Sequence, residues 1–277
     1  MDVFDDHPCA LGEGPLWHPQ RNELFWFDIP GKTLHCKGKA RQRWGFDEYV
    51  SAAGWVDRDT LLMASACGLW RVDIPTGARD PVAPLEADNP ATRSNDGRAD
   101  PQGGFWIGTM GIKAEARAGA IYRYYRGEVR QLFDRITISN AICFTPDGAT
   151  AYFADTFSQS IQKVALDKLG WPRGEPEVFV DLRGDNLNPD GAVVDADGNL
   201  WNAQWGAGRV ACYDRDGQFK RSIRVPASQT TCPAFGGREG ATLFITSAAD
   251  NSDDVQGGMT FATEAGVTGQ REHQVIL

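Results

Sequence analysis

The sequence predicts an all-β fold, a six-bladed β-propeller, and two observations lead to this prediction. A unit made of a small residue, an apolar strand, an Asp/Gly/Asn turn and a second, aromatic-rich strand occurs six times in the 277 residues. Successive units lie roughly 40 to 50 residues apart, a period typical of propeller blades rather than of helical solenoids. Each blade would contain about 46 residues, enough for four short strands and their turns.

Each unit predicts a β-hairpin, because two apolar or alternating segments flank turn residues. In chain order the six units are 14–28, 53–64, 96–108, 140–155, 190–203 and 233–246. Short segments rich in Val, Ile, Phe, Trp and Tyr predict strands within and after them, at 24–29, 61–64, 69–72, 105–108, 120–124, 151–154, 161–165 and 200–203. No segment has the pattern of a long amphipathic helix.

The two ends of the chain must close the ring, because an open stack of sheets would leave exposed edges. Segments 257–263 and 274–277 both have the pattern of strands. We expect the C-terminal strand to pair with one near residues 2–4 and complete the last blade. Since the repeats run from residue 14 to about 246 without a linker, we expect residues 1–277 to form a single domain.

Charge excludes two classes of partner. The formal net charge is -9, with 28 Lys and Arg against 37 Asp and Glu. Nucleic acids and anionic membranes bind clustered basic residues, which this sequence lacks. The first residues include acids where an export signal would be basic and then apolar, and no apolar run approaches a membrane span. We therefore expect a cytoplasmic protein that binds neither nucleic acid nor membrane. From the general frequency of oligomeric states alone, we expect a monomer or weak dimer.

The cysteines do not predict a metal site. The six residues are scattered, without a Cys-x-x-Cys pair, and the four histidines are too dispersed for a three-histidine site. We expect free, buried thiols in preference to disulfides, because a core of this size needs no covalent links.

Four of the six units carry polar residues just before the first strand. These residues are Glu13, the Asn95-Asp96 and Ser139-Asn140 pairs, and Asp190 in Asn188-Pro-Asp190. Because they occupy equivalent places in a symmetric repeat, we expect them to converge on the central channel. Buried carboxylates repel one another unless a cation lies between them. The pattern therefore predicts a central metal site formed by Glu13, Asn140 and Asp190.

Oxygen ligands of this kind favour one hard divalent ion, Ca²⁺, Mg²⁺ or Mn²⁺, and fit Zn²⁺ less well. A simpler interpretation exists for each residue taken alone, because Asp and Asn before Gly commonly form turns with their own backbone. Glu13 is an exception, since Glu is a poor turn residue and stands between two glycines. The equivalence of the positions favours a common site.

Five ordered motifs resemble the SMP-30/gluconolactonase/regucalcin-like sugar lactonases. They are Leu-Gly-Glu-Gly-Pro-Leu-Trp at 11–17, Arg-Ser-Asn-Asp-Gly-Arg-Ala-Asp at 93–100 with Gly-Thr-Met at 108–110, Ile-Ser-Asn-Ala at 138–141, Asn-Pro-Asp-Gly at 188–191 with Asp-Ala-Asp-Gly-Asn-Leu-Trp at 195–201, and Thr-Cys-Pro-Ala-Phe-Gly-Gly at 231–237. The resemblance implies a six-bladed propeller with a single divalent metal in its channel.

By the same resemblance, Glu13, Asn140 and Asp190 are the metal ligands, and Arg93, Asn95 and Glu115 contact the substrate. The implied reaction is hydrolysis of a sugar lactone to the aldonic acid, in which the metal polarises the carbonyl. Asp190 is the expected catalytic residue, acting as general base as well as ligand. Arg93 and Asn95 would orient the substrate, although Arg93 could instead form an ion pair with a neighbouring blade.

Three other functions remain open at this point. A calcium-binding regulatory protein would use the same carboxylates without catalysis and would not need Arg93 or Asn95 at the site. A metal-dependent organophosphate or phosphoester hydrolase could use the same ion. An all-β interaction scaffold would leave the channel inert.

Overall fold

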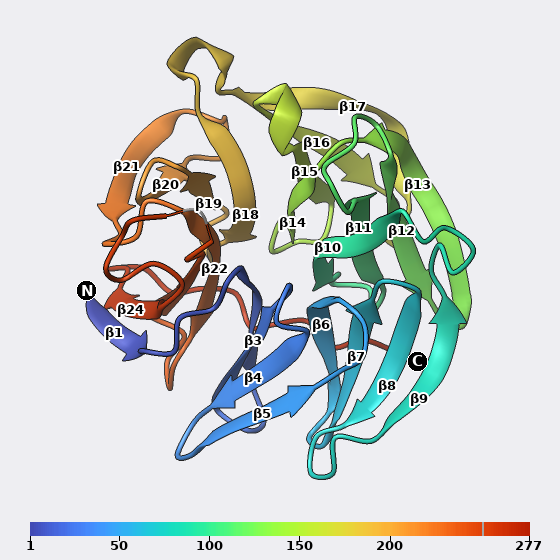
Figure 1. The fold of residues 1–277 in the computed structure, drawn as a ribbon. Helices are drawn as coiled ribbons and strands as arrows, with labels where there is room; N and C mark the ends of the chain where they lie inside the picture. Colours follow the sequence, from blue (N-terminus) through green and yellow to red (C-terminus); the bar gives the residue numbers. More distant parts are fainter. Residues whose placement is uncertain (251) are drawn as a thin grey trace.

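The computed structural model describes residues 1–250 and 252–277, and these form six four-stranded antiparallel sheets around a central axis (Figure 1). Blade 1 contains β2 (Gly12–His18), β3 (Glu23–Asp28), β4 (Thr33–Lys37) and β5 (Arg41–Gly45). Blade 2 contains β6 (Val50–Asp57), β7 (Thr60–Ser65), β8 (Gly68–Asp73) and β9 (Arg79–Pro84). Blade 3 contains β10 (Thr92–Ala99), β11 (Phe105–Gly111), β12 (Gly119–Tyr125) and β13 (Glu128–Ile136). The predicted all-β six-bladed propeller is confirmed.

The second half of the ring repeats this order. Blade 4 contains β14 (Ser139–Phe144), β15 (Thr150–Asp155), β16 (Ser160–Leu166) and β17 (Pro172–Asp181). Blade 5 contains β18 (Asn188–Val194), β19 (Leu200–Trp205), β20 (Arg209–Tyr213) and β21 (Phe219–Arg224). Blade 6 contains β22 (Thr230–Gly236), β23 (Thr242–Ser247), β24 (Thr260–Glu264) and β1 (Asp2–Asp5). Two short 3₁₀ helices, η1 (Thr156–Ser158) and η2 (Arg183–Asp185), lie in loops.

The six predicted hairpins form the two inner strands of the six blades. Each of the inner strands β2, β6, β10, β14, β18 and β22 contacts the next, and β22 contacts β2, so the inner strands form a closed ring. The first residues of these six strands therefore lie at one end of the channel and their last residues at the other.

The N-terminal strand closes the ring, but the predicted pairing segment was wrong. β1 pairs with β24, placing Asp2 opposite Ala262 and Val3 opposite Phe261. Residues 274–277 form no strand. The segment 257–263 was the better prediction, since most of it lies in β24. Residues 274–277 do not pair with β1 because thirteen residues follow β24, and this segment runs along one face of the propeller.

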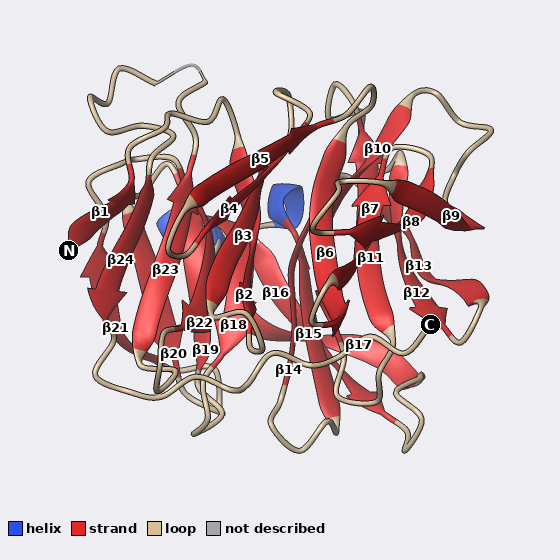
Figure 2. Cartoon of the chain, turned by 90° about the horizontal axis from the view of Figure 1, so that it is seen from below, coloured by secondary structure: helices blue, strands red, loops and turns tan. Residues whose placement is uncertain are grey.

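This C-terminal segment, 265–277, runs along one face of the propeller, at the bottom of Figure 2. Its Gln270 Nε2 donates to the carbonyls of Phe144 and Val194, at the ends of β14 and β18. Glu272 accepts from Arg98 at 2.6 Å, close to the end of β10. The segment therefore covers the end of the channel at which the inner strands finish.

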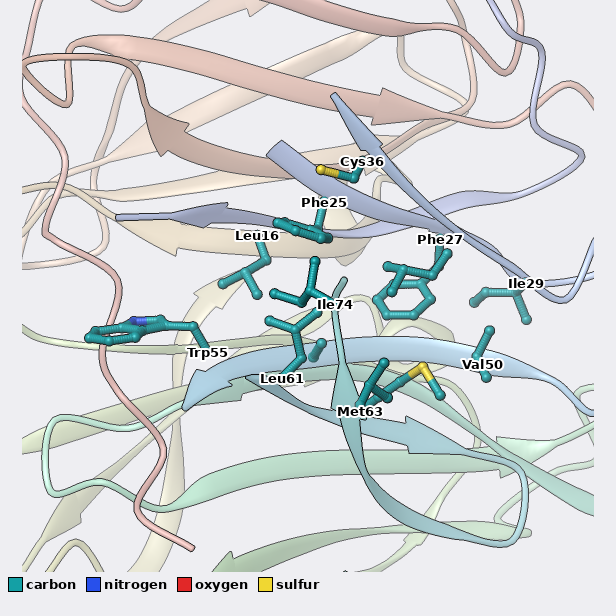
Figure 3. Close-up of a cluster of buried hydrophobic side chains, with 13 residues drawn as sticks. Leu16, Phe25, Phe27, Ile29, Cys36, Val50, Trp55, Leu61, Met63 and Ile74 are labelled. Atoms are coloured by element: carbon teal, nitrogen blue, oxygen red, sulfur yellow. The ribbon is translucent and has the colours of Figure 1, made fainter. Parts of the chain in front are cut away.

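Apolar side chains fill the wedge between neighbouring blades. The cluster between blades 1 and 2 contains Leu16, Phe25, Phe27, Leu61 and Met63, which face one another across the two sheets (Figure 3). Comparable buried clusters lie at the other blade interfaces. Each Å² of apolar surface that these clusters remove from water contributes about 25 cal/mol of stability. The clusters therefore hold neighbouring blades in fixed positions around the axis.

The remaining sequence expectations concern thiols and location. All six cysteines are free, and all are buried except the exposed Cys67, which departs from the expected burial. Among the described residues, no helix is long and apolar enough to cross a membrane. A cytoplasmic location, the single-domain organisation and a monomeric or weakly dimeric state remain predictions.

Candidate functional site

Every inner strand has an irregular register at the place where the predicted site residues lie. The shifts fall between residues 13 and 16, 50 and 52, 94 and 97, 140 and 143, 189 and 192, and 230 and 233. A bulge changes the direction in which a side chain points. Because all six strands have one at an equivalent position, the polar residues of different blades are directed to one place.

Gly14 shows why the local sequence is constrained. Its backbone is left-handed, with φ of 55°, and a Cβ at this position would lie 2.3 Å from the carbonyl oxygen of Ser51. Only glycine avoids both problems. Its N–H donates to Glu13 Oε2 at 2.9 Å, so this glycine also fixes the Glu13 carboxyl.

Glu13 and Asp190 meet in the channel. Their carboxyls lie close enough that each one shifts the pKa of the other. The residues are only 4% and 5% exposed. Burial raises the pKa of both carboxyls above the ordinary range, and the charge of the other carboxyl raises that of Asp190 further. In the absence of a cation, these raised pKa values favour a proton on the pair.

A third carboxyl, Asp96, lies near them and was not predicted as a site residue. It is 3% exposed, its Oδ2 accepts from the backbone N–H of Ile142 at 2.7 Å, and burial raises its pKa to about 6. Its charge also raises the pKa of Glu13 and Asp190. The sequence contained the signal, since Asp96 follows Asn95 before a repeat glycine, but it could not show which of the two faces the ion site.

Asn140 lies in β14 of blade 4, between the blades that carry Asp96 and Asp190. It is buried, and its Oδ1 accepts from Asn95 Nδ2 at 3.4 Å. Its own Nδ2 donates to the hydroxyl of Thr156 at 2.8 Å. The amide oxygen therefore faces Asn95 and the amide nitrogen faces Thr156.

Arg93 and Asn95 are also in the site. Arg93 Nη1 donates to Asn95 Oδ1 and to the carbonyl of Ser94, both at 2.8 Å. Burial lowers the pKa of Arg93 to about 10, an effect that the Glu13 carboxylate opposes. No ion pair of Arg93 with another blade occurs among the described residues, so the alternative role considered for it is not supported.

Glu115 is placed differently. It is exposed, in the loop after β11, and its Oε2 accepts from the backbone N–H of Lys113 at 3.0 Å. Gly111, where β11 ends, pairs with Thr92 at the start of β10, so the loop begins at the same end of the channel as the site. In the residues that the structure covers, no hydrogen bond joins Glu115 to Arg93 or Asn95. Its contact with a substrate stays a prediction.

The donor set fits a hard divalent cation. Two buried carboxyls this close together are costly unless a proton or a cation lies between them, and the Asn140 oxygen, from the blade next to that of Asp190, offers a neutral donor. Within residues 1–250 and 252–277, no three His, Cys, Asp or Glu side chains form a group that could hold a metal by themselves. An ion would therefore need the Asn140 amide oxygen as well as the two carboxylates.

The chain is similar to known proteins over most or all of its length. Residues 11–249 match the family model described as SMP-30/Gluconolactonase/LRE-like region. The crystal structure of a calcium-binding protein, regucalcin, from Agrobacterium tumefaciens superposes with a TM-score of 0.97 and 42% identity, over 100% of this chain and 97% of the other. An L-arabinolactonase of Azospirillum brasilense is 34% identical over 95% of this chain and 91% of its own length. A 6-deoxy-6-sulfogluconolactonase of Pseudomonas putida is 32% identical over 96% and 94%.

Proposed function

The chain belongs to the SMP-30/gluconolactonase/LRE-like family, and from this premise we propose that it is a sugar lactonase whose activity depends on one divalent cation. Its substrate would be a small aldonolactone and its product the aldonic acid. Two relatives that match nearly the whole chain bear lactonase names, which supports the reaction class. The close approach of the buried Glu13 and Asp190 carboxyls, each of which shifts the pKa of the other, is the observation that carries the cation dependence.

Glu13 and Asp190 would hold the cation with their carboxylates, and Asn140 would hold it with its amide oxygen. The bound ion would supply a Lewis acid for the lactone carbonyl and stabilise negative charge that develops there. Because all three donors are oxygen atoms, Ca²⁺, Mg²⁺ and Mn²⁺ are favoured over Zn²⁺.

Asp190 is the proposed general base. A carboxylate can accept a proton from an attacking water within hydrogen-bond reach, and Asp190 is the carboxyl for which burial and the Glu13 charge together favour protonation. Glu13 would then serve as a ligand, held in position by the Gly14 N–H.

Arg93 and Asn95 are proposed to orient the sugar. The two described hydrogen bonds of Arg93 use a single nitrogen, Nη1, and a guanidinium has five N–H donors in a fixed fork. The other donors would serve hydroxyl or carbonyl oxygens of a bound lactone. Glu115 would add a third substrate contact from the loop after β11.

Regulatory calcium binding without turnover is a second candidate, because the superposed structure with a TM-score of 0.97 is described as a calcium-binding protein. This alternative requires the ligands but no general base. It also gives no reason for the buried pairing of Arg93 with Asn95 next to the carboxyls.

A lactone panel separates these candidates. Five- and six-membered aldonolactones would be assayed with the wild type, after chelation, and after each divalent ion is restored. We expect chelation to abolish turnover, one or more ions to restore it, and Asp190→Asn to reduce kcat at least 100-fold, as for loss of a general base. Asp216→Asn, an exposed aspartate of the same blade, is the matched control.

Turnover that survives both chelation and Asp190→Asn would refute the proposal. Tight ion binding without turnover of any lactone would instead favour the regulatory candidate.

A further inference from the structure

A chain of hydrogen bonds runs in one direction across three blades at the site. Arg93 Nη1 donates to Asn95 Oδ1, and Asn95 Nδ2 donates to Asn140 Oδ1. Asn140 Nδ2 then donates to Thr156 Oγ1, which donates to the carbonyl oxygen of Pro189. The first group can only donate and the last can only accept, so the direction of every intermediate bond is determined.

The Thr156 hydroxyl has the decisive place in this chain. It has one proton, which it gives to Pro189 O at 2.7 Å. Toward Asn140 it can therefore only accept, and the group of Asn140 that faces it must be the NH₂, at 2.8 Å. Because the amide is planar, its Oδ1 then points away from Thr156 and accepts from Asn95 Nδ2.

The same hydroxyl joins two of the proposed ligands. Asn140 belongs to β14 in blade 4, and Pro189 directly precedes Asp190 in β18 of blade 5. A bridge from the Asn140 side chain to the Pro189 backbone fixes the separation of these two strands where their donor atoms must converge. Groups that orient metal ligands in this manner commonly affect affinity by 10- to 100-fold.

Thr156 itself is held without help from its side chain. Its N–H donates to Ile138 O at 3.0 Å. The preceding Asp155 carboxylate accepts from the backbone N–H groups of Thr137, Ile138 and Phe157, and so fixes the start of η1. Removal of the hydroxyl should therefore leave the backbone of this loop in place.

We propose that Thr156 is a positioning residue for the divalent-cation site: its hydroxyl orients the Asn140 amide oxygen toward the ion and ties Asn140 to the strand that carries Asp190. The inference rests on the proposed function, because it assumes that Asn140 is a ligand. Thr156 acts through Asn140 and does not itself contact the ion.

The test compares Thr156→Val, which keeps the shape and removes the hydroxyl, with Thr156→Ser, which keeps the hydroxyl. Thr145→Val is the matched control, since the Thr145 hydroxyl also makes hydrogen bonds in a loop of blade 4, with Asp147 and with the backbone of Thr150. Affinity for Ca²⁺, Mg²⁺ and Mn²⁺ would be measured by titration calorimetry on the full chain. Exchange of the Asn140 side-chain NH₂ protons would be followed by NMR without any ion.

We expect Thr156→Val to weaken ion binding at least tenfold and to lose protection of the Asn140 NH₂ protons. Thr156→Ser should bind within about threefold of the wild type, and Thr145→Val should leave affinity unchanged. Wild-type affinity in Thr156→Val, or an equal loss in Thr145→Val, would overturn the inference while leaving the proposed function intact. A wild type that binds no divalent ion would overturn both.

Discussion

Asp190→Asn should stabilise the ion-free protein at alkaline pH while it abolishes ion binding. In the absence of an ion, burial and then the Asp96 charge raise the pKa of Glu13 from 4.5 to about 8, and burial and the Glu13 charge raise that of Asp190. An acid whose pKa is higher in the folded protein contributes stability that is complete below its unfolded pKa. That stability is lost as the pH rises toward the folded pKa. Replacing Asp190 by a neutral amide removes one of these retained protons.

The expected magnitude follows from proton linkage. Consider a proton that the folded protein keeps and the unfolded chain has released. For each pH unit over which this holds, the free energy of unfolding decreases by about 1.4 kcal/mol. A proton that the pair retains from pH 5 to pH 8, the range set by the Glu13 pKa of about 8, therefore costs about 4 kcal/mol. A protein of this size changes its Tm by roughly 2 °C per kcal/mol. The Tm of the variant minus that of the wild type should thus increase by about 8 °C from pH 5 to pH 8. Buried histidines affect both proteins equally and cancel in this difference.

Scanning calorimetry in a chelator tests this expectation, with Asp216→Asn as the control. At a free ion concentration 100 times Kd, the wild type should then gain about 3 kcal/mol and the Asp190→Asn variant much less. A Tm difference that does not change with pH would show that the carboxyl pair keeps no extra proton. Equal stabilisation of both proteins by the ion would show that Asp190 is not a ligand. Either result would refute the reasoning.

Three further predictions concern the rest of the propeller. Glu272→Ala leaves the buried Arg98 without its partner and should cost about 3–5 kcal/mol in urea unfolding, whereas an unchanged midpoint would show that the pair contributes nothing. Deletion of 274–277 removes the buried Val275 and should cost about 2 kcal/mol without preventing folding; a chain that fails to fold would contradict closure by β1 and β24. A thiol reagent should modify only Cys67 in the folded protein and all six cysteines after unfolding, and faster reaction of a second thiol would contradict the described burial.

The fold could be predicted from the sequence because each hairpin is specified by residues that lie close together in the chain. A hairpin is specified by strand residues on either side of a turn, so six copies identify six pairs of inner strands without any knowledge of distant contacts. The closing strand was harder to predict. Both 257–263 and 274–277 have strand patterns, and nothing local indicates which of them pairs with β1.

The site could be predicted in part, for a similar reason. Symmetry places equivalent positions of different blades together, so Glu13, Asn140 and Asp190 could be grouped although they are far apart in sequence. Thr156 could not be found in this way, because it lies in a loop outside the repeat and acts through single hydrogen bonds to other segments. Asp96 could be noticed as part of the Asn95-Asp96 pair, but the direction of its side chain depends on the bulge in β10.

By itself, the sequence determined the repeating hairpins and the ring of blades, and it grouped the oxygen donors that we propose for the site, because spacing and residue type suffice when equivalent units are related by symmetry. Only the tertiary structure decided which end of each amide faces inward, which strand closes the ring and which end of the channel the C-terminal segment covers. These features depend on contacts between segments separated by tens to hundreds of residues. The energy of such contacts depends on distance and direction, which a linear pattern does not specify.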